Sequence, residues 1–174
     1  YRGNLLSAIL ASLSVALVYW AAWRICRSIK PDAPHPFITA AAVLAAAVFA
    51  TSPLMWSQAV MTEVYALNTL LASALLTIAT NLSTRMRSGS NAVLFALYGF
   101  LLGIGLGNHL TLLAIGAPML LWIGLSLGWR PLLSPWLIVS FIIGISIYIS
   151  LPIRADQGPP INWGNADTMR GVGW

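Results

Sequence analysis

Long apolar segments dominate this 174-residue sequence and restrict the folds open to it. The first, "NLLSAILASLSVALVYWAAW" at 4–23, contains no charged residue. A helix that crosses a bilayer needs roughly 17–25 mostly apolar residues. Six segments meet this requirement, at about 4–23, 37–53, 64–82, 91–107, 109–127 and 135–153. We therefore expect an all-α, polytopic transmembrane helix bundle over 1–153, followed by an extracytoplasmic segment over 154–174.

The composition agrees with a membrane protein. Hydrophobic residues make up 59% of the chain and charged residues 7%, whereas soluble domains carry about 25% charged residues. The formal net charge of +5 raises the question of nucleic-acid binding. The basic residues are scattered, however, and form no patch with interleaved aromatic side chains. The lipid bilayer is the expected partner, and nucleic acid is not.

The basic residues also predict an orientation. Six of the nine fall between expected spans one and two, three and four, or five and six: Arg24, Arg27, Lys30, Arg85, Arg87 and Arg130. The other three are Arg2, Arg154 and Arg170. The positive-inside rule places the larger group in the cytoplasm. Both ends of the chain then face outward, and we expect a bacterial inner-membrane protein whose outer turns face the periplasm.

Polar motifs gather in the outer turns of this topology. They are "SQAVMTEVYALN" at 57–68, "GNHLT" at 107–111 and "RADQGPPINWGN" at 154–165. An ionised carboxylate such as Glu63 is expensive in hydrocarbon, so it needs a partner, water or a function. Transporters tend instead to place polar groups at the bilayer midplane, between paired broken helices. The pattern therefore favours a site at the outward-facing surface of the membrane that the chain spans.

The stretch 57–68 leaves two arrangements open. Treated as one helix, it places Ser57, Gln58, Tyr65 and Asn68 within an arc of about 140°, with Glu63 roughly opposite. Either the polar stripe and the carboxylate serve different neighbours, or the helix is broken nearby, for which Pro53 gives a reason. Glu63 itself either pairs with an outer arginine or histidine, or takes part in binding or acid–base chemistry.

Two further side chains on the outer side have alternative roles. His109 can bind phosphate, carry a proton or cap a helix, and Asn108 is suited to the N-cap of the fifth span. Arg154 can hold a phosphate in a bidentate contact or extend toward lipid headgroups. Trp163 fits an interfacial anchor as well as a binding residue.

Small residues predict a helix contact. Gly99, Gly103 and Gly107 recur every four residues, which is the spacing that lets membrane helices pack closely. With one cysteine and two histidines, the sequence offers no set of metal-ligand residues. We expect no cofactor, and the sequence does not decide whether a metal ion takes part.

Four blocks together resemble a known family. "RGNLLSA" (2–8), "WSQAVMTEVYALN" (56–68), "GLGNHLTLL" (105–113) and "LPIRADQGPPINWGN" (151–165) are similar to motifs that occur in this order in the multi-spanning family of the animal transmembrane O-mannosyltransferase. That family is similar to the GT-C superfamily, whose members use polyprenyl-phosphate sugars at the outer or lumenal face. The resemblance implies Glu63 and His109 as catalytic candidates. It implies these residues as substrate-binding candidates: Arg154, Asp156, Asn108, Gln58, Tyr65, Asn68, Asn162 and Trp163.

The chain also departs from the family pattern. The acidic motif near "GDSGE", which usually lies in the outer loop after the family's first span, has no counterpart here. Since the sequence opens on Tyr1, we interpret it as an internal piece, with the main catalytic base expected upstream. The tail "MRGVGW" departs from the aromatic, basic continuation of the family.

These observations predict a membrane glycosyltransferase. It would move a sugar, with mannose as the candidate, from a polyprenyl-phosphate donor to an extracytoplasmic acceptor such as a protein serine or threonine. Two other classes stay open, namely a transporter or lipid flippase and a noncatalytic membrane subunit.

Overall fold

Helices form every regular element of the described chain. The computed structural model describes residues 2–61, 63–84, 91–155 and 157. Its elements are α1 (Arg2–Ile29), α2 (His35–Thr51), α3 (Pro53–Val60), α4 (Tyr65–Thr84), α5 (Ala92–Asn108), α6 (Thr111–Leu127), η1 (Arg130–Leu133), α7 (Pro135–Ile145), η2 (Ser146–Ile149) and α8 (Ser150–Ala155). The expected all-α helix bundle is confirmed.

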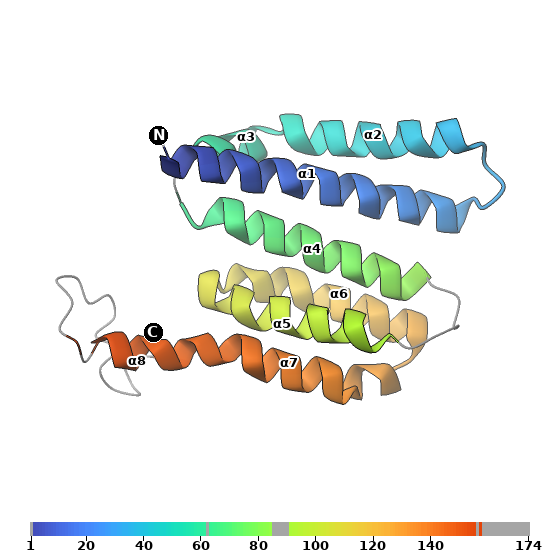
Figure 1. Cartoon of the computed structure of the whole chain (residues 1–174). Coiled ribbons are helices and arrows are strands. Elements are labelled where there is room, and N and C mark those ends of the chain that lie inside the picture. Colours follow the sequence, from blue (N-terminus) through green and yellow to red (C-terminus); the bar gives the residue numbers. More distant parts are fainter. Residues whose placement is uncertain (1, 62, 85–90, 156, 158–174) are drawn as a thin grey trace.

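The helices lie side by side as a layered bundle (Figure 1). α4 lies in the middle, with α1 on one side and α5 and α6 on the other, while α2 packs on α1 and α7 packs on α5. Successive long helices run in opposite directions. We call the end that carries 63–68, 108–111 and 150–155 the motif end, and the opposite end, with Arg24, Arg27, Lys30 and Arg130, the basic end.

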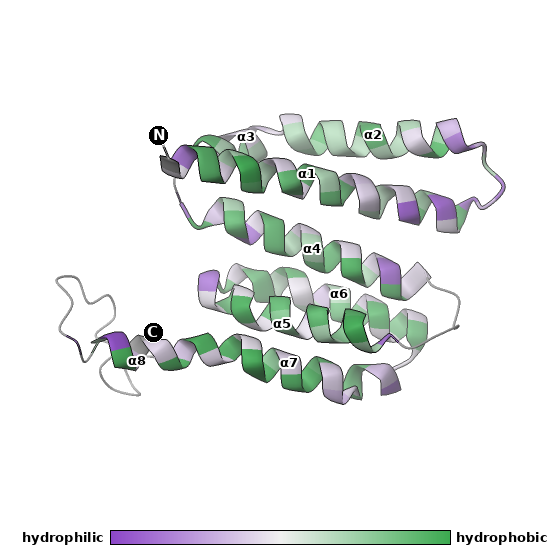
Figure 2. Ribbon diagram, in the orientation of Figure 1, coloured by the Kyte–Doolittle hydropathy of each residue, from purple (hydrophilic) through white to green (hydrophobic). Residues whose placement is uncertain are grey.

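The surface of the bundle is apolar along its length. Figure 2 shows hydrophobic residues along the helices and most of the strongly hydrophilic residues near the two ends. On α7 the exposed residues include Ile138, Val139, Ile142 and Ile143. A water-soluble protein rarely exposes such a continuous apolar surface, so the bundle belongs in a membrane.

Fewer helices than the expected six are clearly long and apolar enough to span a membrane. Three described stretches are long and apolar enough, Gly3–Ile29, Tyr65–Thr84 and Pro135–Ala155, and the pair α2 and α3, bent by 61°, makes up to four. The remaining two, α5 and α6, are apolar but have 17 residues each, the lower limit of about 17 for a spanning helix. The helices occupy the six expected segments, and their crossing of a membrane six times stays a prediction.

The buried core lies between α4, α5 and α6. It contains Leu75, Leu102, Leu112 and Ile123 among other aliphatic side chains. Tyr98 is fully buried there, and its hydroxyl donates a hydrogen bond of 2.8 Å to the carbonyl oxygen of Gly116. A buried hydroxyl needs such a partner. This bond also links α5 to α6, the two helices that the turn at the motif end connects.

Glycines bring α5 and α7 into backbone contact, as their spacing predicts. A Cβ atom built on Gly103 would lie 2.5 Å from the carbonyl oxygen of Phe141 and 3.0 Å from Cα of Gly144. One built on Gly99 would clash with the carbonyl oxygen of Leu137. Only glycine permits this approach, because any side chain would push the helices apart. The contact holds the last long helix, and with it Arg154, against the bundle.

Candidate functional site

The stretch 57–68 is not one helix. α3 ends at Val60 and α4 begins at Tyr65, so Glu63 and Val64 lie in a linker between them. The single-helix arrangement is therefore wrong, and the alternative of a break is confirmed. The break changes the geometry, because Glu63 is no longer fixed opposite the polar stripe by helical periodicity.

A second break precedes α3, at the proline that suggested it. Ser52 adopts an extended backbone, its side-chain oxygen accepts a hydrogen bond of 3.3 Å from the amide of Met55, and Pro53 follows as the first residue of α3. Serine before proline is a favourable helix start. The chain bends by 61° here, so α3 departs from the direction of α2 near the motif end.

Three contacts join the linker and α4 to the turn between α5 and α6. Asn108 donates from Nδ2 to the carbonyl oxygen of Val64 at 3.1 Å. The rings of Tyr65 and His109 lie 5.5 Å apart between centroids, tilted by 46°. In the third contact, Asn68 donates from Nδ2 to the hydroxyl of Thr111 at 3.2 Å. Two motifs that are more than forty residues apart in sequence thus form one surface.

The hydrogen bonds of His109 define which ring nitrogen carries the proton in the neutral ring. Nδ1 lies 3.2 Å from the amide nitrogen of Thr111 and 2.8 Å from its hydroxyl. Because a backbone N–H can only donate, Nδ1 is the acceptor, and the neutral ring carries its proton on Nε2. Within the described residues Nε2 makes no hydrogen bond. A half-buried imidazole with a free Nε2–H is suited to donate to an anionic oxygen.

Asn108 does not serve as the expected N-cap. It is the last residue of α5, and the residue before α6 is Leu110, which makes no side-chain cap hydrogen bond. The amide of Thr111 is satisfied by His109 instead. The carboxamide of Asn108 is free to hold Val64 because the histidine takes over this capping role. Thr111 was missed as a site residue, although a threonine two positions after a histidine is a usable signal.

Glu63 is exposed beside this joined surface. Its neighbour Val64 is held by Asn108, so the backbone next to the carboxylate is anchored. Among the residues that the structure describes, Glu63 makes no ion pair with His109 or Arg154. An exposed, anchored carboxylate is available to an acceptor molecule from outside the bundle.

Two amide oxygens lack a partner in the described chain. Asn68 is 9% exposed, and its Oδ1 accepts no hydrogen bond there; Oε1 of Gln58 is also buried without one. An unsatisfied buried polar atom costs about 1–3 kcal/mol. Such atoms are usually explained by water or a bound group. Both oxygens belong to the motif that holds Glu63, so acceptors for water or a bound group are present there.

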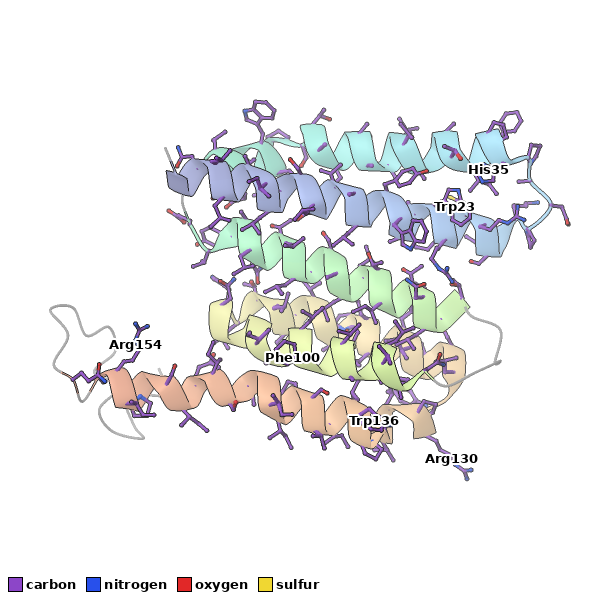
Figure 3. The ribbon with its side chains drawn as sticks, in the orientation of Figure 1. Trp23, His35, Phe100, Arg130, Trp136 and Arg154 are labelled. Atoms are coloured by element: carbon purple, nitrogen blue, oxygen red, sulfur yellow. The ribbon has the colours of Figure 1, made fainter. Side chains whose placement is uncertain are left out.

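Arg154 lies at the same end but on the last helix. It is exposed on α8, and Figure 3 shows its side chain at the motif end, opposite to Arg130. α8 directly continues η2, a 3₁₀ segment within the expected helix over 135–153. Within the described chain, no hydrogen bond joins Arg154 to Glu63 or His109. The three residues share one end of the bundle, and their convergence in one site stays a prediction.

An apolar groove at the motif end was not predicted. It has a volume of about 540 Å³ and lies between the α5–α6 turn and the α7–η2 junction, lined by Leu106, Leu110, Ile142, Ile145, Ser146, Tyr148 and Ile149. Tyr148 closes it on one side by donating a 2.8 Å hydrogen bond to the carbonyl oxygen of Leu106. Leu110 directly follows His109 in the chain, so the groove and His109 share the α5–α6 turn. Periodicity alone could not reveal it, because its walls come from three helices.

Three of the expected substrate-binding residues, Asp156, Asn162 and Trp163, lie outside the described residues. In the described residues, no three of histidine, cysteine, aspartate and glutamate are grouped to hold a metal ion.

Comparison with protein families identifies a relationship for most of the chain. Residues 1–130 match the model of a family described as the N-terminal domain of protein O-mannosyl-transferase TMEM260. This range contains α1 to α6 and both joined motifs, and it ends before α7 and Arg154. No curated protein and no solved structure is significantly similar to the chain.

Proposed function

The chain belongs to the family of the N-terminal domain of protein O-mannosyl-transferase TMEM260, and we propose that it transfers mannose from a polyprenyl-phosphate donor to a serine or threonine hydroxyl of an extracytoplasmic protein. The family relationship makes it a relative of a glycosyltransferase. The observation that carries the proposal further is the joined surface of Val64, Tyr65, Asn108 and His109 beside an apolar groove.

The polyprenyl-phosphate sugar would place its lipid chain in the groove and its phosphate near two polar side chains, His109 and Arg154. An isoprenoid chain is apolar and flexible, and the groove of about 540 Å³ is lined almost entirely by aliphatic side chains. Binding sites of this kind combine apolar walls with a few polar groups that fix orientation. The phosphate would then lie at the mouth of the groove, where His109 donates from Nε2 and Arg154 supplies a positive charge.

The transfer step breaks one bond and forms one. The acceptor oxygen attacks C1 of the sugar from the face opposite the phosphate, the C1–O bond to phosphate breaks, and the phosphate leaves with the electron pair. The proton of the acceptor hydroxyl passes to a carboxylate base other than Glu63. Glu63 orients the acceptor hydroxyl, and Arg154 and His109 stabilise the negative charge that grows on the leaving phosphate. Inversion at C1 follows from attack on the opposite face.

The distribution of polar groups argues against a transporter. The bend between α2 and α3 lies near the motif end rather than at the centre of the bundle. Transporters place substrate sites near the midplane between paired broken helices. Here the unpaired amide oxygens and the exposed carboxylate belong to the motif that reaches the motif end. A site at the surface suits an enzyme that receives its acceptor from the aqueous side.

The proposal is tested by transfer of radiolabelled mannose from polyprenyl-phosphate mannose to protein, in membranes with matched protein levels. His109→Ala should lower the transfer rate by about tenfold or more, since a charge-assisted hydrogen bond contributes about 1.5–3 kcal/mol. His35→Ala is the matched control, because His35 lies at the basic end (Figure 3). Equal activity of both variants, or the absence of transfer by the unmodified protein, would refute the proposal.

A further inference from the structure

A polar pocket lies at the basic end, far from the candidate site. It has a volume of about 200 Å³ and is lined by Trp23, Arg24, Arg27 and Ser28 of α1 and Thr84 of α4. Liquid water occupies about 30 Å³ per molecule, so the pocket has room for a phosphate group. Figure 3 shows Trp23 at this end of the bundle, opposite to Arg154.

The two arginines in this pocket are not neutralised within the described chain. Arg24 donates from Nη2 to the hydroxyl of Thr84 over a long 3.4 Å contact, and its Nε is buried without a hydrogen-bond partner there. Neither Arg24 nor Arg27 forms an ion pair with a described residue. A buried donor without a partner costs about 1–3 kcal/mol. The pocket therefore offers positive charge and unused donors to an anion.

Thr84 holds one arginine in place. Its hydroxyl donates to the carbonyl oxygen of Thr80 at 2.7 Å and accepts from Arg24. Arg27 lies three residues after Arg24, on the same side of the helix. The two guanidinium groups can thus reach the same ligand. Arginine matches the geometry of phosphate oxygens better than lysine does.

The position of the pocket indicates a lipid as the source of the phosphate. The uncharged stretch 4–23 is long enough to cross the hydrocarbon core, and Arg24 follows it directly. The Trp23 ring stacks with that of Trp20 at 6.1 Å and meets the His35 ring at 5.7 Å. Aromatic clusters of this kind are typical of the membrane–water interface. The pocket is therefore expected at the depth of lipid headgroups.

We propose that the pocket formed by Arg24, Arg27, Ser28 and Thr84 binds the phosphate of an anionic phospholipid in the leaflet at the basic end. The lipid ties the end of α1 to the end of α4, because the arginines come from one helix and Thr84 from the other. Basic pockets between membrane helices are suited to anionic headgroups. This proposal does not depend on the proposed enzymatic function, since the pocket lies at the opposite end of the bundle.

The test is a titration of the intact protein in a zwitterionic detergent with phosphatidylglycerol, with the apparent affinity taken from the rise in unfolding temperature. Each arginine near the surface contributes about 1 kcal/mol to anionic lipid binding, or about fivefold. Arg27→Gln should weaken binding about fivefold, and the double variant Arg24→Gln, Arg27→Gln by at least about tenfold. Arg27 is exposed, so the single variant keeps the test valid if the double variant does not fold.

Arg130→Gln is the matched control, because it removes the same charge at the same end but outside the pocket. It should leave the affinity within about twofold of the unmodified protein. Equal stabilisation by phosphatidylcholine, or equal losses in Arg27→Gln and Arg130→Gln, would overturn the proposal. Full competition by millimolar inorganic phosphate would overturn the assignment to a lipid.

Discussion

Asn108 donates a hydrogen bond to the carbonyl oxygen of Val64 over 3.1 Å, between residues 44 positions apart in the sequence. It joins the end of α5 to the linker that carries Glu63. Glu63 lies in a bend rather than in a helix, and a side chain from another helix holds the backbone of its neighbour Val64.

Asn108→Ala should lower the rate of mannose transfer more than it lowers stability. Loss of a hydrogen bond of this kind costs about 0.5–1.5 kcal/mol, whereas a displaced Glu63 would reduce the transfer rate by about tenfold or more. Transfer in membranes and thermal unfolding in detergent measure the two effects. Asn91→Ala is the control, because Asn91 precedes α5 at its other end and makes no cap bond with its side chain. Equal effects of both changes would contradict the role of Asn108.

Glu63→Gln should impair turnover without unfolding the bundle. Glu63 is exposed, so its replacement should change stability by less than about 0.5 kcal/mol. The amide keeps the shape of the side chain but loses the charge that orients the acceptor hydroxyl. The measurement is the maximal transfer rate at saturating donor. Asp32→Asn removes a carboxylate near the basic end and should have no effect; full activity in Glu63→Gln would exclude the carboxylate from the reaction.

Arg154→Ala should weaken donor binding by about tenfold or more, because a charge-assisted contact to phosphate is lost. Arg154→Lys should restore binding only in part, since lysine lacks the bidentate fork. The KM for polyprenyl-phosphate mannose is the quantity to measure. Arg130→Ala is the matched control at the opposite end (Figure 3). An unchanged KM in Arg154→Ala would leave Arg154 as a side chain that only reaches lipid headgroups.

Gly103→Leu should lower the free energy of unfolding of the bundle in detergent by about 1–3 kcal/mol or more. The added side chain would meet the backbone of α7, which cannot rotate away as a side chain can. Ala114→Leu makes a similar change at an exposed position of α6 and should be tolerated. Circular dichroism or fluorescence during heating gives the unfolding temperatures. A similar unfolding temperature for both variants would mean that α5 and α7 do not depend on this contact.

The topology can be tested with two cysteines in a Cys26→Ser background. Asp32→Cys lies next to the basic end and Gln157→Cys lies beyond α8, at the motif end. An impermeant thiol reagent applied to intact cells should label only one of them. Labelling of both, with membranes shown to be sealed, would exclude the predicted six-span arrangement.

Hydropathy predicted where the helices lie because an apolar segment is a local property. The expected segments agree with α1, α2, α4, α5 and α6 to within several residues. The start of α4 at Tyr65 agrees with the expected span at 64–82, which placed Glu63 in a turn. The sequence offers a reason for a break only at Pro53, since neither proline nor glycine occurs at 61–64. At the break over 61–64, Asn108 of another helix donates a hydrogen bond to Val64. No periodicity within 57–68 could contain that information.

For the contact between α5 and α7, the sequence predicted the contribution of α5 but not that of α7. The stripe of Gly99, Gly103 and Gly107 indicated that α5 packs closely, but the sequence did not identify the partner. Gly144 is a single glycine in α7, and one glycine carries little weight as a pattern. The groove beside His109 depends on the same pairing. Both required the arrangement of helices in space.

The glycine contact also lowers the side-chain entropy lost where α7 joins the bundle. When most side chains become buried, they lose rotamer freedom worth up to about 2 kcal/mol each, whereas glycine has no side chain to immobilise. Gly103 and Gly144 meet backbone to backbone, so the closest approach of α5 and α7 immobilises no side chain at these two positions. Two helices separated in sequence by the whole of α6 are therefore held together at a point where packing requires no choice of rotamer.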